Sequence, residues 1–167
     1  MRLFTFLLLL ASSLASAQPE PFDCEGSAPH RQFDFWLGEW EVHNAAGELQ
    51  GHNLIDKVQR GCALSEQWRS VRGGSGQSLN WYDPGSGQWR QLWLDAGASI
   101  IDINGGLQQD GAMLLVGTIY YLNAGTQHPF RGRWTPLEDG RVRQFFEQQD
   151  DAGAWQTWFE GFYSRKQ

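Results

Sequence analysis

Residues 33–42 of this chain read FDFWLGEWEV and place four large aromatic side chains within eight residues. They stand directly before the first run in which apolar and polar residues alternate, and such alternation is typical of a half-buried β-strand. Phe33, Trp36 and Leu37 would share one face of a helical turn or two between residues 31 and 37. We therefore expect a short helical segment that covers one end of a β-domain, with the wall of the domain starting just after it.

Strand-like runs continue from this segment to the end of the chain, and they recur about every 8–14 residues with turn signals between them. Asp-Gly and Gly-Gly pairs supply the positive φ angles that tight hairpins require, so we expect breaks at pairs such as residues 73–74 and 105–106. The expected strands are residues 40–44, 51–60, 63–72, 77–82, 88–95, 99–104, 113–122, 130–136, 142–149 and 155–164.

The number and length of these runs indicate the fold class. No long segment carries apolar residues at the i, i+3, i+4 and i+7 spacing of an amphipathic helix, so helices should be few and short. Ten short strands joined by hairpins would leave unpaired edges in an open sheet, and closure removes those edges. We therefore predict an all-β fold, a closed antiparallel up-and-down barrel of about ten strands with a short N-terminal helical segment. A β-sandwich of two sheets is the alternative.

The N-terminus has the pattern of a secretory signal peptide. Arg2 gives a positive start, an apolar run follows, and Ala-Ser-Ala at residues 15–17 supplies small side chains for cleavage. The run is too short and wrongly flanked for a stable membrane span, and no later run approaches the length of one. We expect a secreted protein, periplasmic in a bacterium, with residues 1–17 as signal peptide, residues 18–31 as an irregular tail and residues 32–167 as a single barrel domain.

The chain has two cysteines, Cys24 and Cys62. In an oxidising compartment an isolated pair is typical of a structural disulfide. The bond would close a loop of about 38 residues and tie the tail to the start of a strand, which we expect to stabilise the fold by about 2–4 kcal/mol. Neither cysteine has a Cys or His partner at a ligand spacing, so no metal site is expected.

The charge of the chain narrows the class of partner. Thirteen basic and nineteen acidic residues give a formal net charge of −6, and the arginines are scattered along the chain. A phosphate backbone requires a basic face, so nucleic acid is not an expected partner. A small apolar ligand is the partner that the sequence favours, and nothing in it specifies a protein partner.

An ordered set of short motifs spans nearly the whole expected domain. It comprises residues 33–40, Gly61-Cys62 with Leu64 and Glu66, Ser78-Leu79-Asn80 with Tyr82-Asp83, Trp89 with Trp93, Val142-Arg143-Gln144 with Glu147 and Trp155, and Phe159 with Tyr163. This set resembles a family of secreted bacterial proteins of unknown function, which is itself similar to lipocalin-like and nitrobindin-like β-barrels. The resemblance implies a closed antiparallel barrel that could enclose a small-molecule cavity, and it implies no known activity.

Several carboxylates share strand faces with apolar side chains, because residues two apart in a strand share a face. Inside a barrel they would be partly desolvated, and their pKa would rise unless a cation paired with them. One interpretation is a polar floor that orients a ligand or acts as an acid–base group. The other is a buried Arg–Glu network or a set of acids that face solvent. The acids are Glu66, Asp102, Glu147 and Glu160, and the available cations are Arg131, Arg133 and Arg143.

Eight of the tryptophans fall on or beside expected strands, where most should belong to the core. The last expected strand, residues 155–164, carries aromatic side chains on both faces. One set would face the barrel interior, and we expect residues 33–37 to cover the other. Our hypothesis for a binding site takes Trp40, Trp68, Trp93 and Phe159 as apolar walls and Glu66, Glu147 and Glu160 as orienting polar groups.

The nitrobindin-like resemblance suggests haem as a cofactor. Haem needs an axial ligand, usually histidine. No histidine lies in the last two expected strands, where the resemblance implies the ligand, and each histidine is expected at the surface. We therefore expect no cofactor, and haem is disfavoured. The histidines are His30, His43, His52 and His128.

Three functions remain open on this basis. The leading hypothesis is non-catalytic binding of a small hydrophobic or amphipathic molecule inside the barrel. The first alternative is an enzyme, an isomerase or cyclase that acts on a hydrophobic substrate; nucleophilic catalysis is not favoured, because no nucleophile elbow is present. The second alternative is an envelope protein whose barrel is filled by its own side chains and which acts through its surface.

Overall fold

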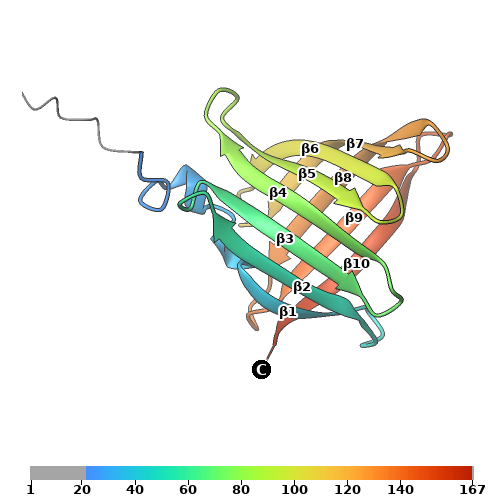
Figure 1. Ribbon diagram of the computed structural model, residues 1–167, viewed down its shortest axis with the longest axis horizontal. Coiled ribbons are helices and arrows are strands. Elements are labelled where there is room, and N and C mark those ends of the chain that lie inside the picture. Colours follow the sequence, from blue (N-terminus) through green and yellow to red (C-terminus); the bar gives the residue numbers. More distant parts are fainter. Residues whose placement is uncertain (1–21, 167) are drawn as a thin grey trace, which may run out of the picture.

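The chain forms a closed antiparallel barrel of ten strands (Figure 1). The computed structural model describes residues 22–166, so the expected signal peptide, residues 1–17, and the first residues of the expected tail lie outside the described part. Each strand pairs with the next along the chain, and β1 pairs with β10. The strands are β1 (Gly38–His43), β2 (Leu49–Val58), β3 (Ala63–Ser70), β4 (Ser75–Asp83), β5 (Gln88–Asp95), β6 (Ser99–Leu107), β7 (Met113–Tyr121), β8 (Thr126–Pro136), β9 (Val142–Gln149) and β10 (Trp155–Arg165).

Pairing between the first and last strands closes the sheet and confirms the predicted barrel. Trp40 lies opposite Arg165 at one end of this pairing, and His43 lies opposite Phe162 at the other. The sandwich alternative is wrong, because one continuous sheet has no edge left to form a second layer. β5 and β9 have the expected bounds, and the other strands differ from expectation by a few residues at their ends.

The break expected at residues 105–106 is wrong, because both glycines lie inside β6. Gly105 lies against the neighbouring strand, where an added Cβ would stand 2.2 Å from the backbone oxygen of Leu114. Its lack of a side chain therefore permits a close approach of two backbones rather than a turn. At residues 73–74 a turn is present as expected, and Gly73 has the positive φ of 90° that favours glycine.

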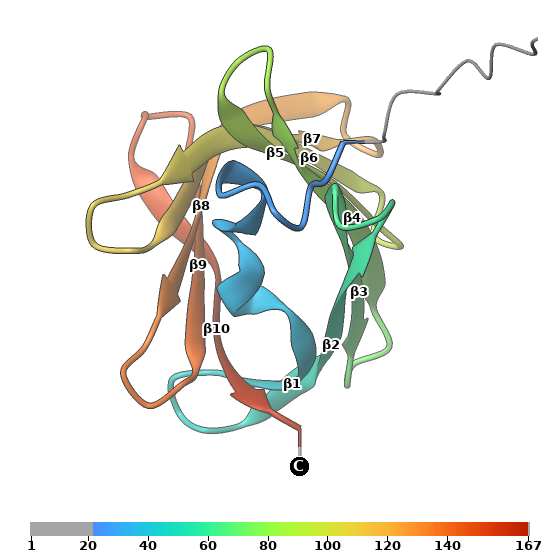
Figure 2. The same cartoon turned by 90° about the vertical axis from the view of Figure 1, so that its left-hand side faces the viewer.

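The N-terminal segment fills one end of the barrel (Figure 2). It consists of two short 3₁₀ turns, η1 (Pro29–Arg31) and η2 (Asp34–Trp36). Phe33 and Trp36 are fully buried and stack with their ring centroids 5.0 Å apart. The segment thus covers one end of the barrel from within. No helix among residues 22–166 is long and apolar enough to cross a membrane.

The rings of this segment contact residues that point into the barrel. Phe33 meets Trp89 and Trp134 edge-on, with centroids 5.5 and 5.2 Å apart. The indole N–H of Trp89 donates to the Pro29 oxygen at 3.1 Å. The expectation that residues 33–37 cover the outer face of the last strand is therefore wrong. These residues add to the aromatic core that the wall residues Trp89 and Trp134 form at this end.

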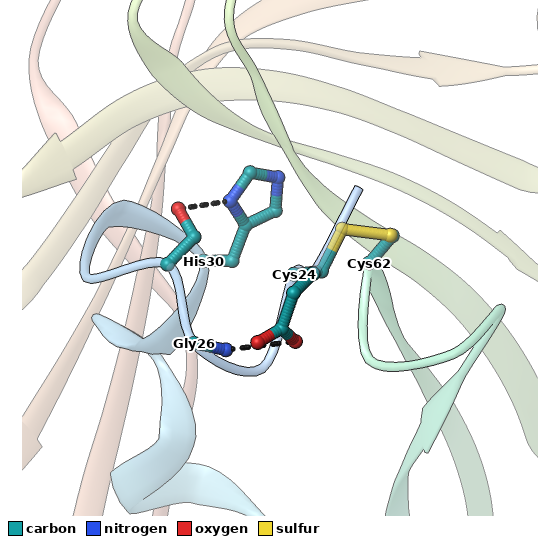
Figure 3. Close-up of a disulfide and its surroundings, with 6 residues drawn as sticks. Cys24, Gly26, His30 and Cys62 are labelled. Atoms are coloured by element: carbon teal, nitrogen blue, oxygen red, sulfur yellow. Dashed lines mark hydrogen bonds between the residues drawn. A yellow bond between two sulfur atoms is a disulfide. The ribbon is translucent and has the colours of Figure 1, made fainter. Parts of the chain in front are cut away.

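A disulfide joins Cys24 to Cys62, as predicted (Figure 3). Cys62 lies in the turn between β2 and β3, so the bond ties the tail to the rim of the filled end. His30 Nδ1 lies 2.9 Å from Ser27 Oγ, and the His30 ring meets the Tyr82 ring edge-on. His30 is buried, and the prediction of a surface histidine is wrong at this position, because the tail folds over the barrel end.

Replacing both cysteines with serine should lower the free energy of unfolding by about 2–4 kcal/mol, because the bond closes a loop with a sequence separation of 38 residues and restricts the unfolded chain. Urea titration of the C24S/C62S variant and the wild type, followed by far-UV circular dichroism, measures the difference. The native β-spectrum should persist in the variant. Equal unfolding midpoints would show that the bond does not stabilise the filled end.

Candidate functional site

A cavity of about 310 Å³ lies at the end of the barrel opposite the N-terminal segment. Its rim includes Gly74 and Gly97, which follow β3 and β5. In an antiparallel barrel those turns lie at the opposite end from the start of β5, where Trp89 holds the N-terminal segment. The filled end and the hollow end are therefore the two halves of one interior.

The cavity wall is mainly aromatic. Trp68 and Phe159 meet edge-on with centroids 6.1 Å apart, and Phe146 lies 6.3 Å from Phe159. Rings in such edge-to-face contact hold one another in place and leave an apolar surface toward the cavity. The aromatic lining residues are Trp68, Trp93, Tyr121, Phe146, Trp158, Phe159 and Tyr163.

A β-bulge in β10 places two consecutive aromatic side chains on the cavity. The register between β9 and β10 shifts between Thr157 and Phe159, which leaves Trp158 as the extra residue. Both Trp158 and Phe159 line the cavity, although regular alternation would turn one of them outward. The Trp158 indole N–H donates to the Tyr121 hydroxyl at 2.9 Å, which fixes it at the rim.

A buried carboxylate forms the floor of the cavity. Glu66 is only 3% exposed. Its Oε1 accepts a hydrogen bond from Asn53 Nδ2 at 2.7 Å, and its Oε2 accepts one from Ser78 Oγ at 2.6 Å. Glu66 and Ser78 are direct cross-strand partners in β3 and β4, so pairing of the sheet brings them together.

This hydrogen bonding continues across the neighbouring strands. Asn80 Nδ2 donates to Ser78 Oγ at 2.8 Å, and Gln91 Nε2 donates to Asn80 Oδ1 at 2.7 Å. Asn80 and Gln91 are again direct partners, in β4 and β5. All three side chains are buried, so their mutual hydrogen bonds replace those lost with water.

Tyr163 completes the polar layer from the other side of the barrel. Its hydroxyl donates to Gln144 Oε1 and accepts from Asn53 Nδ2 at 3.1 Å. Burial raises the pKa of Tyr163 well above its ordinary value, and the nearby Glu66 raises it further. Tyr163 therefore remains a neutral phenol next to the carboxyl group.

Burial also changes the acidity of Glu66. It raises the pKa of Glu66 from 4.5 to about 7, and the hydrogen bonds from Ser78 and Asn53 oppose this effect without cancelling it. No arginine, lysine or histidine is among the lining residues, so no cation offsets the loss of water. Near neutral pH the cavity floor can therefore both accept and release a proton.

A second carboxylate lies at the rim, where it is held by three donors. Asp95 Oδ1 accepts from the Ser99 backbone N–H at 3.1 Å. Its Oδ2 accepts from the Ser99 hydroxyl and, at 3.3 Å, from the Trp93 indole N–H. These bonds link the turn after β5 to an aromatic wall residue and so give the mouth of the cavity a defined shape.

Four of the residues proposed from the sequence line this cavity. Glu66, Trp68, Trp93 and Phe159 come together from β3, β5 and β10. Trp40 is buried in the filled end instead, where its indole N–H donates to the Trp36 oxygen at 2.9 Å.

Glu147 and Glu160 do not line the cavity, and we leave them out of the candidate site. Their neighbours Phe146 and Phe159 face inward, so strand alternation turns both acids outward. There Glu147 pairs with Arg131 at 2.6 Å, and Glu160 accepts from Arg143 Nε at 2.7 Å. The alternative interpretation named a buried Arg–Glu network or acids that face solvent; here both acids face outward and form partly exposed pairs with arginine.

Most of the polar layer was not predicted from the sequence as part of a site. Strand alternation alone could have placed Gln91 between Trp89 and Trp93 on one face, because all three are buried or half-buried toward the interior. The same alternation relates Gln144 to Phe146. Neutral amide side chains were not among the residues proposed for the site, although here they hold the carboxylate in place. The missed residues are Asn53, Ser78, Asn80, Gln91, Gln144 and Tyr163.

None of the four histidines lines the cavity. His30 belongs to the filled end, and His128 is 6.1 Å from the Tyr121 ring without being a lining residue. His43 and His52 line other surface hollows. The residues of the cavity therefore do not fit a haem held by a histidine.

Comparison with known proteins adds no family or relative. No protein-family model matches the chain, and no curated protein is significantly similar to it in sequence. The closed ten-stranded barrel is consistent with the lipocalin-like barrel that the sequence resemblance implies.

Replacing Glu66 with glutamine should flatten the dependence of stability on pH. Because the folded pKa is about 7 and the ordinary value is 4.5, the folded state holds this proton more tightly than the unfolded chain. The free energy of unfolding of the wild type should fall by about 3 kcal/mol as pH rises from 4.5 to 7 and then level off. Urea titrations across this pH range measure the effect. Parallel curves for wild type and Glu66→Gln would contradict the assigned acidity.

Proposed function

We propose that this protein is a secreted binding protein, periplasmic in a bacterium, that holds a small hydrophobic or amphipathic molecule inside its barrel. The main evidence for this proposal is the aromatic-walled cavity of about 310 Å³ with buried Glu66 at its floor. Protein sites for small ligands commonly combine apolar walls with a few placed polar groups. The signal pattern of residues 1–17 and the Cys24–Cys62 bond favour an extracytoplasmic compartment.

The cavity suits a compact ligand. Its volume lies near the lower end of the range of roughly 300–1,000 Å³ that is common for ligand sites. A molecule of one or two rings could cover the aromatic walls and still place one polar group at Glu66. Burial of the ligand's apolar surface would favour binding by about 25 cal/mol for each Å² removed from water.

The filled-barrel alternative receives less support. Side chains fill the interior at the end that holds Phe33 and Trp36, and the buried amides fill the middle. Beyond Glu66 a volume large enough for a ligand remains open toward the rim. An envelope protein that acts only through its surface has no physical need for this hollow half.

The neutral dye N-phenyl-1-naphthylamine should bind in the cavity and fluoresce more strongly there than in water. Replacing Trp158 with alanine should weaken this binding by about tenfold, because a wall contact worth on the order of 1–2 kcal/mol is removed. Trp158 is 38% exposed, so the variant should still fold. Fluorescence titration of the dye measures the dissociation constants.

Trp155→Ala is the matched control for this experiment. Trp155 belongs to the same strand but lies outside the cavity, under the guanidinium of Arg131 at 4.2 Å. Its replacement should leave dye binding within twofold of wild type, on the order of the scatter expected for a distant site. Equal losses for both variants, or no dye binding to the wild type, would contradict binding in this cavity.

Acid–base catalysis on a hydrophobic substrate is the second candidate, and Glu66 favours it. A carboxyl group with a pKa of about 7 in a cavity without cations is a suitable general base near neutral pH. Tyr163 stands beside it as a neutral phenol, whose hydroxyl accepts from Asn53 and donates to Gln144. An isomerase or cyclase would use the Glu66 carboxylate to move a proton on a substrate that the aromatic walls hold.

The substrate 5-nitrobenzisoxazole tests Glu66 as a base. The carboxylate would take the C3 proton while the N–O bond breaks and its electron pair passes to oxygen, which gives the cyanophenolate product. The rate, followed by absorbance of the phenolate, should rise with pH through about 7 and fall at least tenfold in Glu66→Gln. Glu147→Gln, on the outer surface, is the control. A rate unchanged by Glu66→Gln would remove the support for catalysis.

A further inference from the structure

We propose that the cavity selects a ligand with a cationic amino group, which binds the Glu66 carboxylate at the floor while the aromatic walls hold the apolar part. This inference rests on the proposed binding function and names the class of ligand. It follows from the charges of the lining, the hydrogen bonds of Glu66 and the kind of wall that surrounds it.

The cavity lining contains acidic side chains and no basic ones. Glu66 at the floor and Asp95 at the rim are its ionisable acids, and no arginine, lysine or histidine is among the lining residues. An organic anion would enter beside the acidic side chains of Glu66 and Asp95 with no basic lining residue to pair with, which is unfavourable. A cation would instead be attracted to these acidic side chains. Fatty acids and other apolar anions are thus poor candidates.

Glu66 has the hydrogen-bonding capacity that a bound ammonium group needs. A carboxylate offers about four acceptor sites. Asn53 and Ser78 occupy one site on each oxygen, at 2.7 and 2.6 Å, and fix the orientation of the group. Among residues 22–166 no other side chain donates to Glu66, which lines the cavity. An ammonium group donates hydrogen bonds but accepts none, so it complements the acceptor sites of the carboxylate.

The walls favour the same class of ligand. Cations are attracted to the faces of Trp, Tyr and Phe rings, and the attraction is larger where water is excluded. Trp68 and Phe159 stand together over this space from opposite strands, and Trp93 lies on β5 nearby. An aromatic or alicyclic amine would therefore place its charge at the floor and its ring among these side chains.

Binding of a cation should depend on pH through Glu66. The groups that face it are Asn53 from β2, Ser78 from β4 and Tyr163 from β10, and only Tyr163 among them titrates. Tyr163 stays neutral because burial raises its pKa. Asp95 is at the distant rim, held by Ser99. Since the pKa of Glu66 is about 7 without ligand, a cation must displace its proton below that pH, and affinity should fall about tenfold per pH unit.

Three probes of one shape test the proposal: 1-naphthylmethylamine, which is protonated at pH 6 and 8, neutral 1-naphthalenemethanol, and anionic 1-naphthoic acid. Isothermal titration calorimetry with the full mature protein should give tightest binding for the amine at pH 8. The alcohol should bind at least tenfold more weakly at that pH, and the acid should not bind. Between pH 8 and pH 6 the amine should lose about tenfold in affinity, while the alcohol should not change.

Glu66→Gln should remove the preference for the amine over the alcohol and the pH dependence of amine binding. The matched control is Glu147→Gln, which changes an outward carboxylate paired with Arg131 and should behave as wild type. Equal affinities for amine and alcohol at both pH values would overturn the selection of cations while leaving the binding function in place, provided that N-phenyl-1-naphthylamine still binds. If neither the dye nor any of the three probes binds, the binding function itself is wrong.

Discussion

Ten strands closed into one barrel enclose more space than the side chains of the wall can fill, and this constraint shapes the whole molecule. A barrel of about eight strands is just wide enough for its own side chains to fill it or to hold one small ligand. Here the chain adds Phe33 and Trp36 from its own N-terminal segment to fill one half, and the Cys24–Cys62 bond ties that segment down. The other half has no such filler and remains a cavity of about 310 Å³. The aromatic segment before β1 is therefore a structural part of the interior, and the opposite end remains hollow.

Between the two halves lies a layer of buried polar side chains centred on Glu66. A carboxyl group without a cationic partner is unfavourable in such a place, and the hydrogen bonds from Asn53 and Ser78 offset that penalty only in part. The pKa of Glu66, near 7, reflects the part of this free-energy penalty that the hydrogen bonds do not offset. Residues that reduce stability in this way are common at functional sites, because the same unfavourable burial makes the group responsive to a ligand or a proton. The layer thus separates the filled part of the interior from the cavity.

The sequence predicted the architecture better than the site, for physical reasons. Turn residues mark hairpins locally, so the bounds of β5 and β9 and the closed barrel could be inferred from pattern alone. The compartment argument similarly predicted the Cys24–Cys62 bond. Strand alternation identified Glu66 and Trp68 as sharing a face, but it could not say which face of each strand points inward. Phe159 and Glu160 were therefore assigned to one site although neighbours in a strand face opposite ways, and the bulge that turns Trp158 inward depends on pairing with β9.

If the hollow half of the barrel holds a small molecule, native mass spectrometry of the mature protein, purified from its own host without denaturation, should reveal it. We expect a complex heavier than the polypeptide by the mass of one small molecule, which is released when the barrel is unfolded and is a basic, ring-containing compound. A bare polypeptide mass under native conditions, from protein that has never been exposed to denaturant, would contradict this expectation.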